Sequence, residues 1–348
     1  MFRGDRHLTG VAAGRLPPSL AVRWRHVCPE AVASTAAIVG ETVYVGCDDA
    51  HLYALNLADG RVRWTYAAKD AIRSSPTVLR LSGPTNRTIV CFGDEDGTVH
   101  AIDARRGTAV WTYQTDGPVI SSPNVDRGRI IVGSYDGTLY CLDARTGKLV
   151  WQYETEDRIH GTPCVAGGVA LTAGCDARLH VVRLSDGKAM RTVDMDAVSG
   201  SAAAVRGSQV FVGTYGGRVL AIDFNVGKVA WWFEDTARQF PFLSSAAITE
   251  TTVFISGRDK RLHALDLKTG RQRWEFASRG RMESSPVVVG DRVFIASYDG
   301  NLYAVDIASG RQRWRFETGA PITASPAVAR GRLVIGTEDG VIYCFGSP

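Results

Sequence analysis

One tryptophan recurs at a nearly constant spacing along almost the whole chain. The intervals between successive positions are 40, 47, 40, 40, 40, 43 and 40 residues. From the second position onward, a glycine stands four residues before each. A period of about 40 residues is typical of repeat architectures, in which each unit buries its apolar surface against its neighbours. The positions are Trp24, Trp64, Trp111, Trp151, Arg191 (in place of tryptophan), Trp231, Trp274 and Trp314.

Each repeat predicts four short antiparallel strands. Apolar and polar residues alternate with period two in runs such as LYALN (52–56) and RVRWTY (61–66), and Asp-Gly or Thr-Gly turns separate the runs. In the third unit we place strands A to D at 121–125, 130–134, 138–143 and 148–153. Four antiparallel strands in a repeat of about 40 residues are typical of a β-propeller blade. The sequence therefore predicts an all-β propeller.

The two ends of the chain complete each other. The last unit supplies strands A, B and C and stops at Gly346, where its fourth strand is due, whereas residues 21–26 form a fourth strand with no preceding third strand. Joining them closes the ring without a free sheet edge. We therefore predict a leader at 1–20 and a single eight-bladed propeller at 21–346, whose blade 8 combines 325–346 with 21–26.

The repeats resemble a known family. The runs CLDARTGKLVW (141–151) and ALDLKTGRQRW (264–274) are similar to the tryptophan-docking motif of PQQ-type β-propeller repeats. This family includes quinoprotein dehydrogenases and the lipoprotein scaffold of the bacterial outer-membrane β-barrel assembly machine. The resemblance covers residues 20–346, and residues 2–10 are similar to the short leader that precedes such repeats. It implies that each tryptophan packs against the glycine turn of the adjacent blade.

Blade 4 departs from this motif. Arg191 replaces the tryptophan, and Arg183 replaces the usual aspartate of the same unit. We interpret these changes as decay of one repeat, offset by the rest of the ring.

The family resemblance raises the question of a quinone cofactor. The quinoprotein dehydrogenases are larger, pair adjacent cysteines near the quinone and bind calcium with carboxylate and amide groups, whereas this chain has no adjacent cysteines and lacks the additional length. We therefore expect no cofactor and no true quinoprotein dehydrogenase. His100, His180 and His263 occupy the same strand position on three different blades, so we expect no metal site, because three such side chains cannot converge on one ion.

Charge and cysteine content restrict the partners. Forty basic and 36 acidic residues give a net charge of only +4, too little to demand nucleic acid, and no apolar run approaches the ~18–20 residues of a membrane span. The seven cysteines are scattered, and the first ten residues contain no apolar secretory region. We expect reduced cysteines and a cytoplasmic monomer, or an exported protein if a signal peptide has been removed.

The expected site lies on the face formed by the D–A and B–C connections, around the mouth of the central channel. The residues leading into strand A differ between blades, being Ala33, Arg73, Ile120, His160, Ser199, Leu243, Glu283 and Thr323, and the connection at 234–243 is three residues longer than usual. The opposite face carries an insertion at 80–88. The candidate ligand-binding residues are Arg73, Arg158, His160, Asp194, Tyr215, Phe240, Phe242, Arg281, Glu283 and Tyr298.

Two functions fit this mouth. The first is a non-catalytic binding or scaffold propeller that engages a protein segment or a small ligand. The alternative is a cofactor-independent enzyme in which His160 and Glu283 carry out acid–base chemistry on a small molecule. A closed pocket that holds both residues favours the enzyme, an open mouth favours the scaffold, and a merely solvated rim favours neither.

Overall fold

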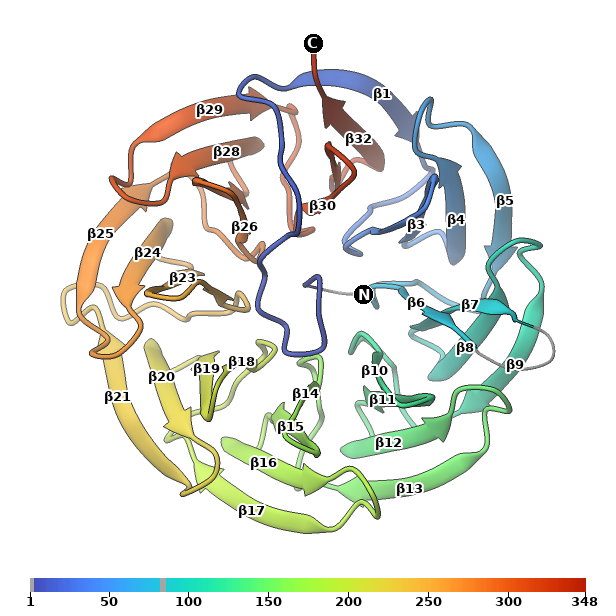
Figure 1. The fold of residues 1–348 in the computed structure, drawn as a ribbon, viewed down its shortest axis with the longest axis horizontal. Helices are drawn as coiled ribbons and strands as arrows, with labels where there is room; N and C mark the ends of the chain where they lie inside the picture. Colours follow the sequence, from blue (N-terminus) through green and yellow to red (C-terminus); the bar gives the residue numbers. More distant parts are fainter. Residues whose placement is uncertain (1–2, 82–85) are drawn as a thin grey trace.

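The computed structural model describes residues 3–81 and 86–348, and residues 82–85 of the insertion at 80–88 lie outside the described residues. The described residues form 32 strands in eight four-stranded antiparallel sheets, with no helix among them. The sheets stand around a central channel as the blades of a propeller (Figure 1). This arrangement confirms the predicted eight-bladed fold. Within each blade, strand A is innermost and strand D outermost.

In blades 1 to 7, the four strands of each sheet lie side by side in the order in which they occur along the chain. The A strands of blades 1 to 8 are β2 (Ala37–Val39), β6 (Thr77–Arg80), β10 (Asn124–Asp126), β14 (Cys164–Ala166), β18 (Ala204–Arg206), β22 (Ala247–Ile248), β26 (Val287–Val289) and β30 (Ala327–Ala329). The B strands are β3 (Thr42–Gly46), β7 (Thr88–Gly93), β11 (Arg129–Gly133), β15 (Val169–Ala173), β19 (Gln209–Gly213), β23 (Thr252–Ser256), β27 (Arg292–Ala296) and β31 (Arg332–Gly336). The C strands are β4 (His51–Asn56), β8 (Thr98–Asp103), β12 (Thr138–Asp143), β16 (Arg178–Arg183), β20 (Arg218–Asp223), β24 (Arg261–Asp266), β28 (Asn301–Asp306) and β32 (Val341–Gly346). The D strands are β5 (Val62–Ala67), β9 (Ala109–Gln114), β13 (Leu149–Glu154), β17 (Ala189–Asp194), β21 (Lys228–Glu234), β25 (Gln272–Ala277), β29 (Gln312–Glu317) and β1 (Ala21–Val27).

The ring closes through its two ends, as predicted. Strand β1 pairs antiparallel with β32, from Ala21 opposite Gly346 to Val27 opposite Val341. One register shift lies between Val22 and Trp24. The N-terminal strand is therefore the outer strand of blade 8, and the sheet has no unpaired edge at the junction.

The recurring tryptophans dock between blades. The Trp151 indole N–H donates to the Leu184 carbonyl of blade 4 at 2.9 Å. Gly187, in the turn below the indole, has a φ of +72°, and a Cβ there would lie 2.7 Å from the Trp151 ring. Glycine is therefore required for both the backbone conformation and the contact. Trp314 differs because strand D of the next blade is β1, which no C–D turn joins to β32, and its ring packs against Phe345 at 5.6 Å between centroids.

Arg191 takes the place of the docking tryptophan. Its guanidinium donates to the carbonyls of Val226 and Asn225 in blade 5, each at 3.0 Å. Its side chain also covers Gly227, which has a φ of +73°. The prediction that blade 4 is a decayed repeat is therefore wrong at this position, because arginine satisfies the same turn with two donors where the indole offers one.

The Ser/Thr-rich stretch after each tryptophan forms a ring of hydrogen bonds between blades. The backbone N–H of Ser75 donates to the Ser122 hydroxyl at 2.9 Å, and Ser325 closes the ring by donating to Thr35 at 3.3 Å. The ring is interrupted at Ala202, which has no hydroxyl. These bonds explain why strand A of blade 3 begins at Asn124 and not at the predicted residue 121.

The leader is part of the fold. Residues 3–12 cross the channel, and their carbonyls accept hydrogen bonds from the inner edges of blades 4 to 7 (Figure 1). The N–H of Val165 donates to Arg6 at 2.9 Å, and that of Val288 donates to Gly10 at 2.9 Å. Arg3 is buried and donates to the carbonyls of Ala246 and Pro286. Desolvation lowers the pKa of Arg3 to about 9.

The cysteines are separate and mostly buried. All seven are unpaired, and only Cys175 is half-exposed. Burial raises the pKa of the Cys91 and Cys164 thiols above the ordinary range, which disfavours the reactive thiolate. We predict that the intact mass is the same with and without reductant. A mass lower by two hydrogens for each bridge under non-reducing conditions would contradict this. The cytoplasmic location of the protein stays a prediction.

Candidate functional site

The D–A and B–C connections meet on one face, as predicted. In blade 3 the N–H of Thr155 donates to Gly137 at 2.8 Å, and that of Ile159 donates to Ser134 at 3.0 Å. Each D–A connection therefore rests on the B–C turn of the blade it leaves. The channel mouth on this face is an open cavity of about 240 Å³. Its walls include the hydroxyl groups of the serine ring, together with Arg73, Ile120, His160 and Leu243.

Blade 5 contributes Gly200 to the mouth and not Ser199, contrary to the predicted register. Ser199 is buried and donates to the Gly213 carbonyl at 2.7 Å. A Cβ on Gly200 would lie 3.4 Å from Tyr215 Cε2 and 3.5 Å from His160 Cδ2. The missing side chain leaves His160 and Tyr215 as the two walls of a small gap.

His160 is held by a neighbouring blade. Its Nδ1 lies 2.5 Å from the Tyr135 hydroxyl in the B–C turn of blade 3. Burial, together with the positive charge of Arg158, lowers the pKa of His160 below its ordinary value, so the imidazole that shares this hydrogen bond with the Tyr135 hydroxyl is neutral at pH 7. The Arg158 guanidinium carbon lies 5.5 Å from the Tyr135 ring centroid, within the range of a cation–π contact.

Two exposed aromatic side chains extend this group. Tyr215 is 46% exposed and Phe240 is 50% exposed. The Phe240 carbonyl lies 3.3 Å from the position of a Cβ on Gly217, so the long connection rests on the turn that carries Tyr215. We call Tyr135, Arg158, His160, Tyr215 and Phe240 the aromatic arc. Four of these five residues are among the sequence-predicted candidates, and Tyr135 is the one that the prediction missed.

The other charged candidates form separate groups. Glu283 accepts from Arg258 at 2.7 Å and lies 3.4 Å from Arg281, whose guanidinium stacks on Tyr298 at 3.7 Å from the ring centroid. Arg73 pairs with acidic residues of blades 1 and 2, Asp48 at 3.0 Å and Glu95 at 2.9 Å. Neither group is bonded to His160.

Two candidate residues do not line the channel mouth. Phe242 is 2% exposed and packs edge-on against His263, so it belongs to the core. Asp194 ends the outermost strand of blade 4, opposite Arg178. The period of the repeat predicts where each residue stands in its blade. It does not predict whether the side chain points toward the mouth or away from it.

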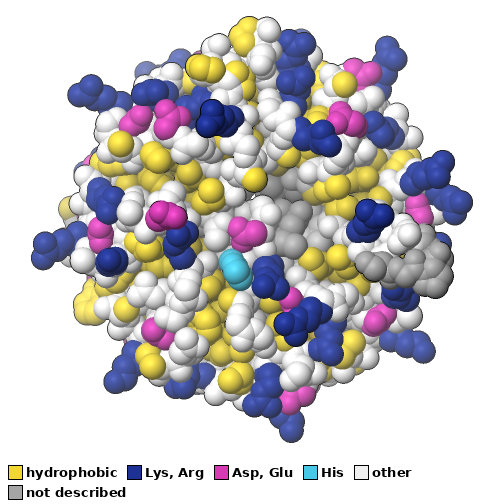
Figure 2. Space-filling model, in the orientation of Figure 1, with side chains coloured by type: hydrophobic (Ala, Val, Ile, Leu, Met, Phe, Trp, Pro, Cys, Tyr) yellow, Lys and Arg dark blue, Asp and Glu magenta, His cyan; other side chains and the backbone are white. Residues whose placement is uncertain are grey.

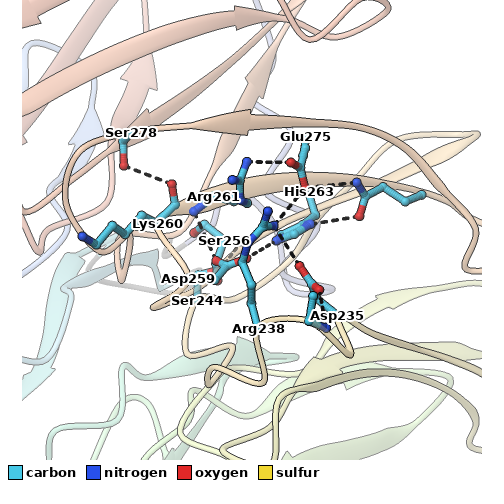
Figure 3. A network of polar contacts seen from close by, with 12 residues as sticks. Asp235, Arg238, Ser244, Ser256, Asp259, Lys260, Arg261, His263, Glu275 and Ser278 are labelled. Carbon is cyan, nitrogen blue, oxygen red and sulfur yellow. Dashed lines mark hydrogen bonds and ion pairs between the residues drawn. The ribbon is translucent and has the colours of Figure 1, made fainter.

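The start of the long connection is tied to the outer strand of blade 6 (Figure 3). Arg238 pairs with Asp235 at 3.1 Å and with Glu275 at 3.8 Å. Glu275 also accepts from Arg261 at 2.6 Å. These ion pairs fix the connection, so that Phe240 is presented from an anchored loop.

The strand-C histidines serve the blades in which they stand. His100, His180 and His263 bond Asp94, Asp176 and Asp259 at 2.9, 2.8 and 2.6 Å. No group of three or more metal-ligating side chains occurs in the described part of the chain. The mouth is lined by hydroxyls, without the carboxylate and amide cluster that a calcium-bound quinone requires. The residues present do not fit that cofactor.

The comparisons with known proteins agree with this geometry. The solved structure of BamB from Moraxella catarrhalis is similar with a TM-score of 0.79 and 19% identity, covering 94% of this chain and 100% of that one. The quinohemoprotein alcohol dehydrogenase from Comamonas testosteroni is similar with a TM-score of 0.80 and 16% identity, covering 100% of this chain and 80% of that one. At these identities the likeness shows the fold alone.

A curated relative is similar over a short stretch. The polyvinylalcohol dehydrogenase of Sphingopyxis sp. (strain 113P3) is 31% identical over 78 residues, which are 22% of this chain and 12% of that protein. Among the described residues no helix is long and apolar enough to cross a membrane.

The family is shown by a model that matches most of the repeats. The family described as outer membrane protein assembly factor BamB matches residues 17–118, 79–197 and 235–346. The matches leave out residues 1–16, residues 198–234, which hold the four strands of blade 5, and residues 347–348, whereas Arg191 lies inside the second match. The chain therefore belongs to the PQQ-type repeat family that carries the BamB description.

Proposed function

We propose that this protein is a non-catalytic scaffold that binds a segment of a partner protein through the aromatic arc. The observation that carries the proposal is that two exposed aromatic side chains, Tyr215 and Phe240, stand on loops that touch each other, and that Tyr215 lies across Gly200 from the anchored Tyr135–His160 pair. Tyrosine, tryptophan and arginine are the residues most enriched among the energetic centres of protein interfaces. A solved BamB structure has the same fold, which supports a scaffold role for this chain.

The geometry of the mouth supports binding over catalysis. An acid–base site would need His160 and Glu283 to share one enclosed point. Instead, His160 is bonded to Tyr135, and Glu283 is held by two arginines of blades 6 and 7. The cavity that His160 lines is open, Glu283 is not part of its lining, and its hydroxyls already bond neighbouring blades. No contact between His160 and Glu283 therefore supports the enzyme alternative.

The arc presents its side chains in a fixed geometry. Tyr135 is held by His160, and the connection that carries Phe240 is held by the Arg238 ion pairs. A binding surface that is already ordered loses less conformational entropy when a partner docks. Gly200 leaves a gap in which a small side chain of the partner fits between Tyr215 and His160.

The proposal predicts that the arc variants lose partner binding. Tagged wild-type protein is used to capture partners from the source cells, and binding of the purified partner is then measured by calorimetry. Tyr215→Ala and Phe240→Ala are each expected to weaken binding by about 1–3 kcal/mol, because each removes an aromatic contact. Both side chains are half-exposed, so the melting temperature should change little.

Two controls locate the effect. Glu283→Gln changes a residue on the same face but outside the arc, and Arg80→Ala changes a residue on the opposite face. Both are expected to bind like the wild type. Equal losses from Tyr215→Ala and Arg80→Ala would show that the arc is not the binding surface. A turnover that disappears in Glu283→Gln would support the enzyme alternative.

A further inference from the structure

Charge is divided between the two faces of the propeller. Outside the strands, the D–A and B–C connections carry 8 Lys or Arg and 19 Asp or Glu. The described A–B and C–D connections, on the opposite face, carry 12 Lys or Arg and 5 Asp or Glu. The small net charge of +4 therefore conceals one acidic and one basic face. We call the side of the A–B and C–D connections the basic face.

The positive charges of the basic face are accessible and spread around the ring. Eleven of the 12 basic residues in these connections are exposed, and six of the seven C–D connections carry at least one. Figure 2, which views this face, shows Lys and Arg side chains around the whole periphery. The distribution fits an extended anionic plane better than a narrow groove.

Comparison of the repeats shows that one arginine beside the C–D connections lacks the aspartate partner found in other blades. In blades 6 and 7, Arg273 pairs with Asp266 at 2.6 Å and Arg313 pairs with Asp306 at 3.0 Å. In blade 1 the corresponding arginine is Arg63, but asparagine stands in place of the aspartate. Arg63 lines one groove with Arg105 and Arg106 of blade 2.

Exposed aliphatic side chains accompany the cations. They lie in or next to the A–B and C–D connections and are between 38% and 57% exposed. Of the exposed aromatic side chains, Tyr215 and Phe240 lie on the acidic face, and Trp232 lies within the outer strand β21. Basic residues interspersed with aliphatic ones are typical of proteins that lie on anionic membranes. The aliphatic residues are Val39, Val62, Leu149, Met190, Val226 and Val229.

We propose that the basic face docks flat on a lipid bilayer that contains anionic headgroups. The cations attract the headgroups, and the aliphatic side chains between them reach the boundary of the acyl region. A nucleic acid would be expected to meet exposed aromatic side chains for stacking or a linear basic stripe. The aromatic side chains of the Arg63 groove, Tyr44 and Trp64, are buried and half-buried, and the basic residues are spread around the ring. In this orientation the acidic face and the aromatic arc point away from the bilayer.

Vesicle binding tests the proposal. The full chain is mixed with sedimenting vesicles of phosphatidylcholine alone, or of phosphatidylcholine with 30% phosphatidylglycerol as an illustrative composition (about one anionic lipid in three), at low and physiological salt. Binding is expected only to the anionic vesicles and is expected to weaken as salt rises, because surface charges are screened over about 8–10 Å. Equal binding to both compositions, or no binding to either, would overturn the proposal.

A pair of double variants with the same net charge tests the face. Arg106→Glu with Lys148→Glu reverses two exposed charges of the basic face, and Lys69→Glu with Arg279→Glu reverses two on the acidic face. At about 1 kcal/mol for each basic residue near the membrane, the first pair is expected to lower the partition coefficient at least tenfold. The second is expected to change it less than twofold. Melting curves of both double variants are recorded to check that each is folded.

The remaining outcomes decide against the proposal. If both double variants lose binding equally, binding follows net charge and not the basic face. If polyglutamate or duplex DNA at equal charge concentration displaces the protein from anionic vesicles, the face prefers a polyanion other than a bilayer. The test is independent of the aromatic arc, because Tyr215→Ala is expected to bind vesicles like the wild type.

Discussion

Removal of residues 1–27 is expected to abolish the cooperative unfolding of this protein or cause it to aggregate. The deletion removes β1, so β32 loses its outer partner and presents an unpaired edge to solvent. It also removes Trp24, which is buried and donates to the Leu57 carbonyl of blade 1 at 2.9 Å. Circular dichroism melting and size-exclusion chromatography of the truncated and full chains measure the effect.

A shorter deletion separates the two parts of this segment. Removal of residues 1–12 keeps β1 but takes away the part of the leader that crosses the channel, with the fully buried Leu8 and four carbonyls that accept hydrogen bonds from blades 4 to 7. We expect a folded protein with a lower melting temperature, because loss of one buried leucine alone typically costs 2–5 kcal/mol. If the chain lacking 1–27 melts like the full chain, closure through β1 does not hold the ring together.

The fold could be predicted because its determinants repeat. The docking tryptophan, the glycine four residues earlier and the period-two strands occur in phase, so an error in one unit is corrected by the others. The leader has no such signal. It binds mainly through backbone carbonyls, such as those of Arg6 and Gly10, which any sequence supplies. Its place in the channel could not be inferred from residue types.

The site was harder to predict than the fold because it depends on the directions of loop side chains. A difference of one residue exchanges Ser199, which is buried, for Gly200, which opens the gap beside His160. Phe240 and Phe242 are two residues apart in one connection, yet the first is exposed and the second is buried. Neither contrast follows from the period of the repeat.

The charge of the two faces was accessible to sequence reasoning. Once the order of strands is predicted, each connection belongs to a known face, and the charged residues can be sorted between the faces without coordinates. The net charge of +4 does not reveal the two faces, because a net charge does not show how opposite charges are separated over the surface. What the sequence could not show is which of these charges are exposed or lack an acidic partner.

Substitution of a docking residue is expected to destabilise the ring in proportion to what it buries. Trp151→Ala removes a side chain that is 7% exposed, with its bond to Leu184 and its contact with Gly187, and should cost about 3–5 kcal/mol. Arg191→Ala removes two hydrogen bonds from a more exposed side chain and should cost about 1–2 kcal/mol. Urea denaturation of both variants measures the difference.

The reverse substitution tests whether Arg191 replaces the docking tryptophan. Gly227, with its φ of +73°, is the same turn that receives the indole in other blades, so Arg191→Trp is expected to bury the ring there and to match or exceed wild-type stability. If Arg191→Ala is as stable as the wild type, blade 4 does not use this contact. If Arg191→Trp is as unstable as Arg191→Ala, the turn of blade 5 has become specific for the guanidinium, whose two donors reach the carbonyls of Asn225 and Val226.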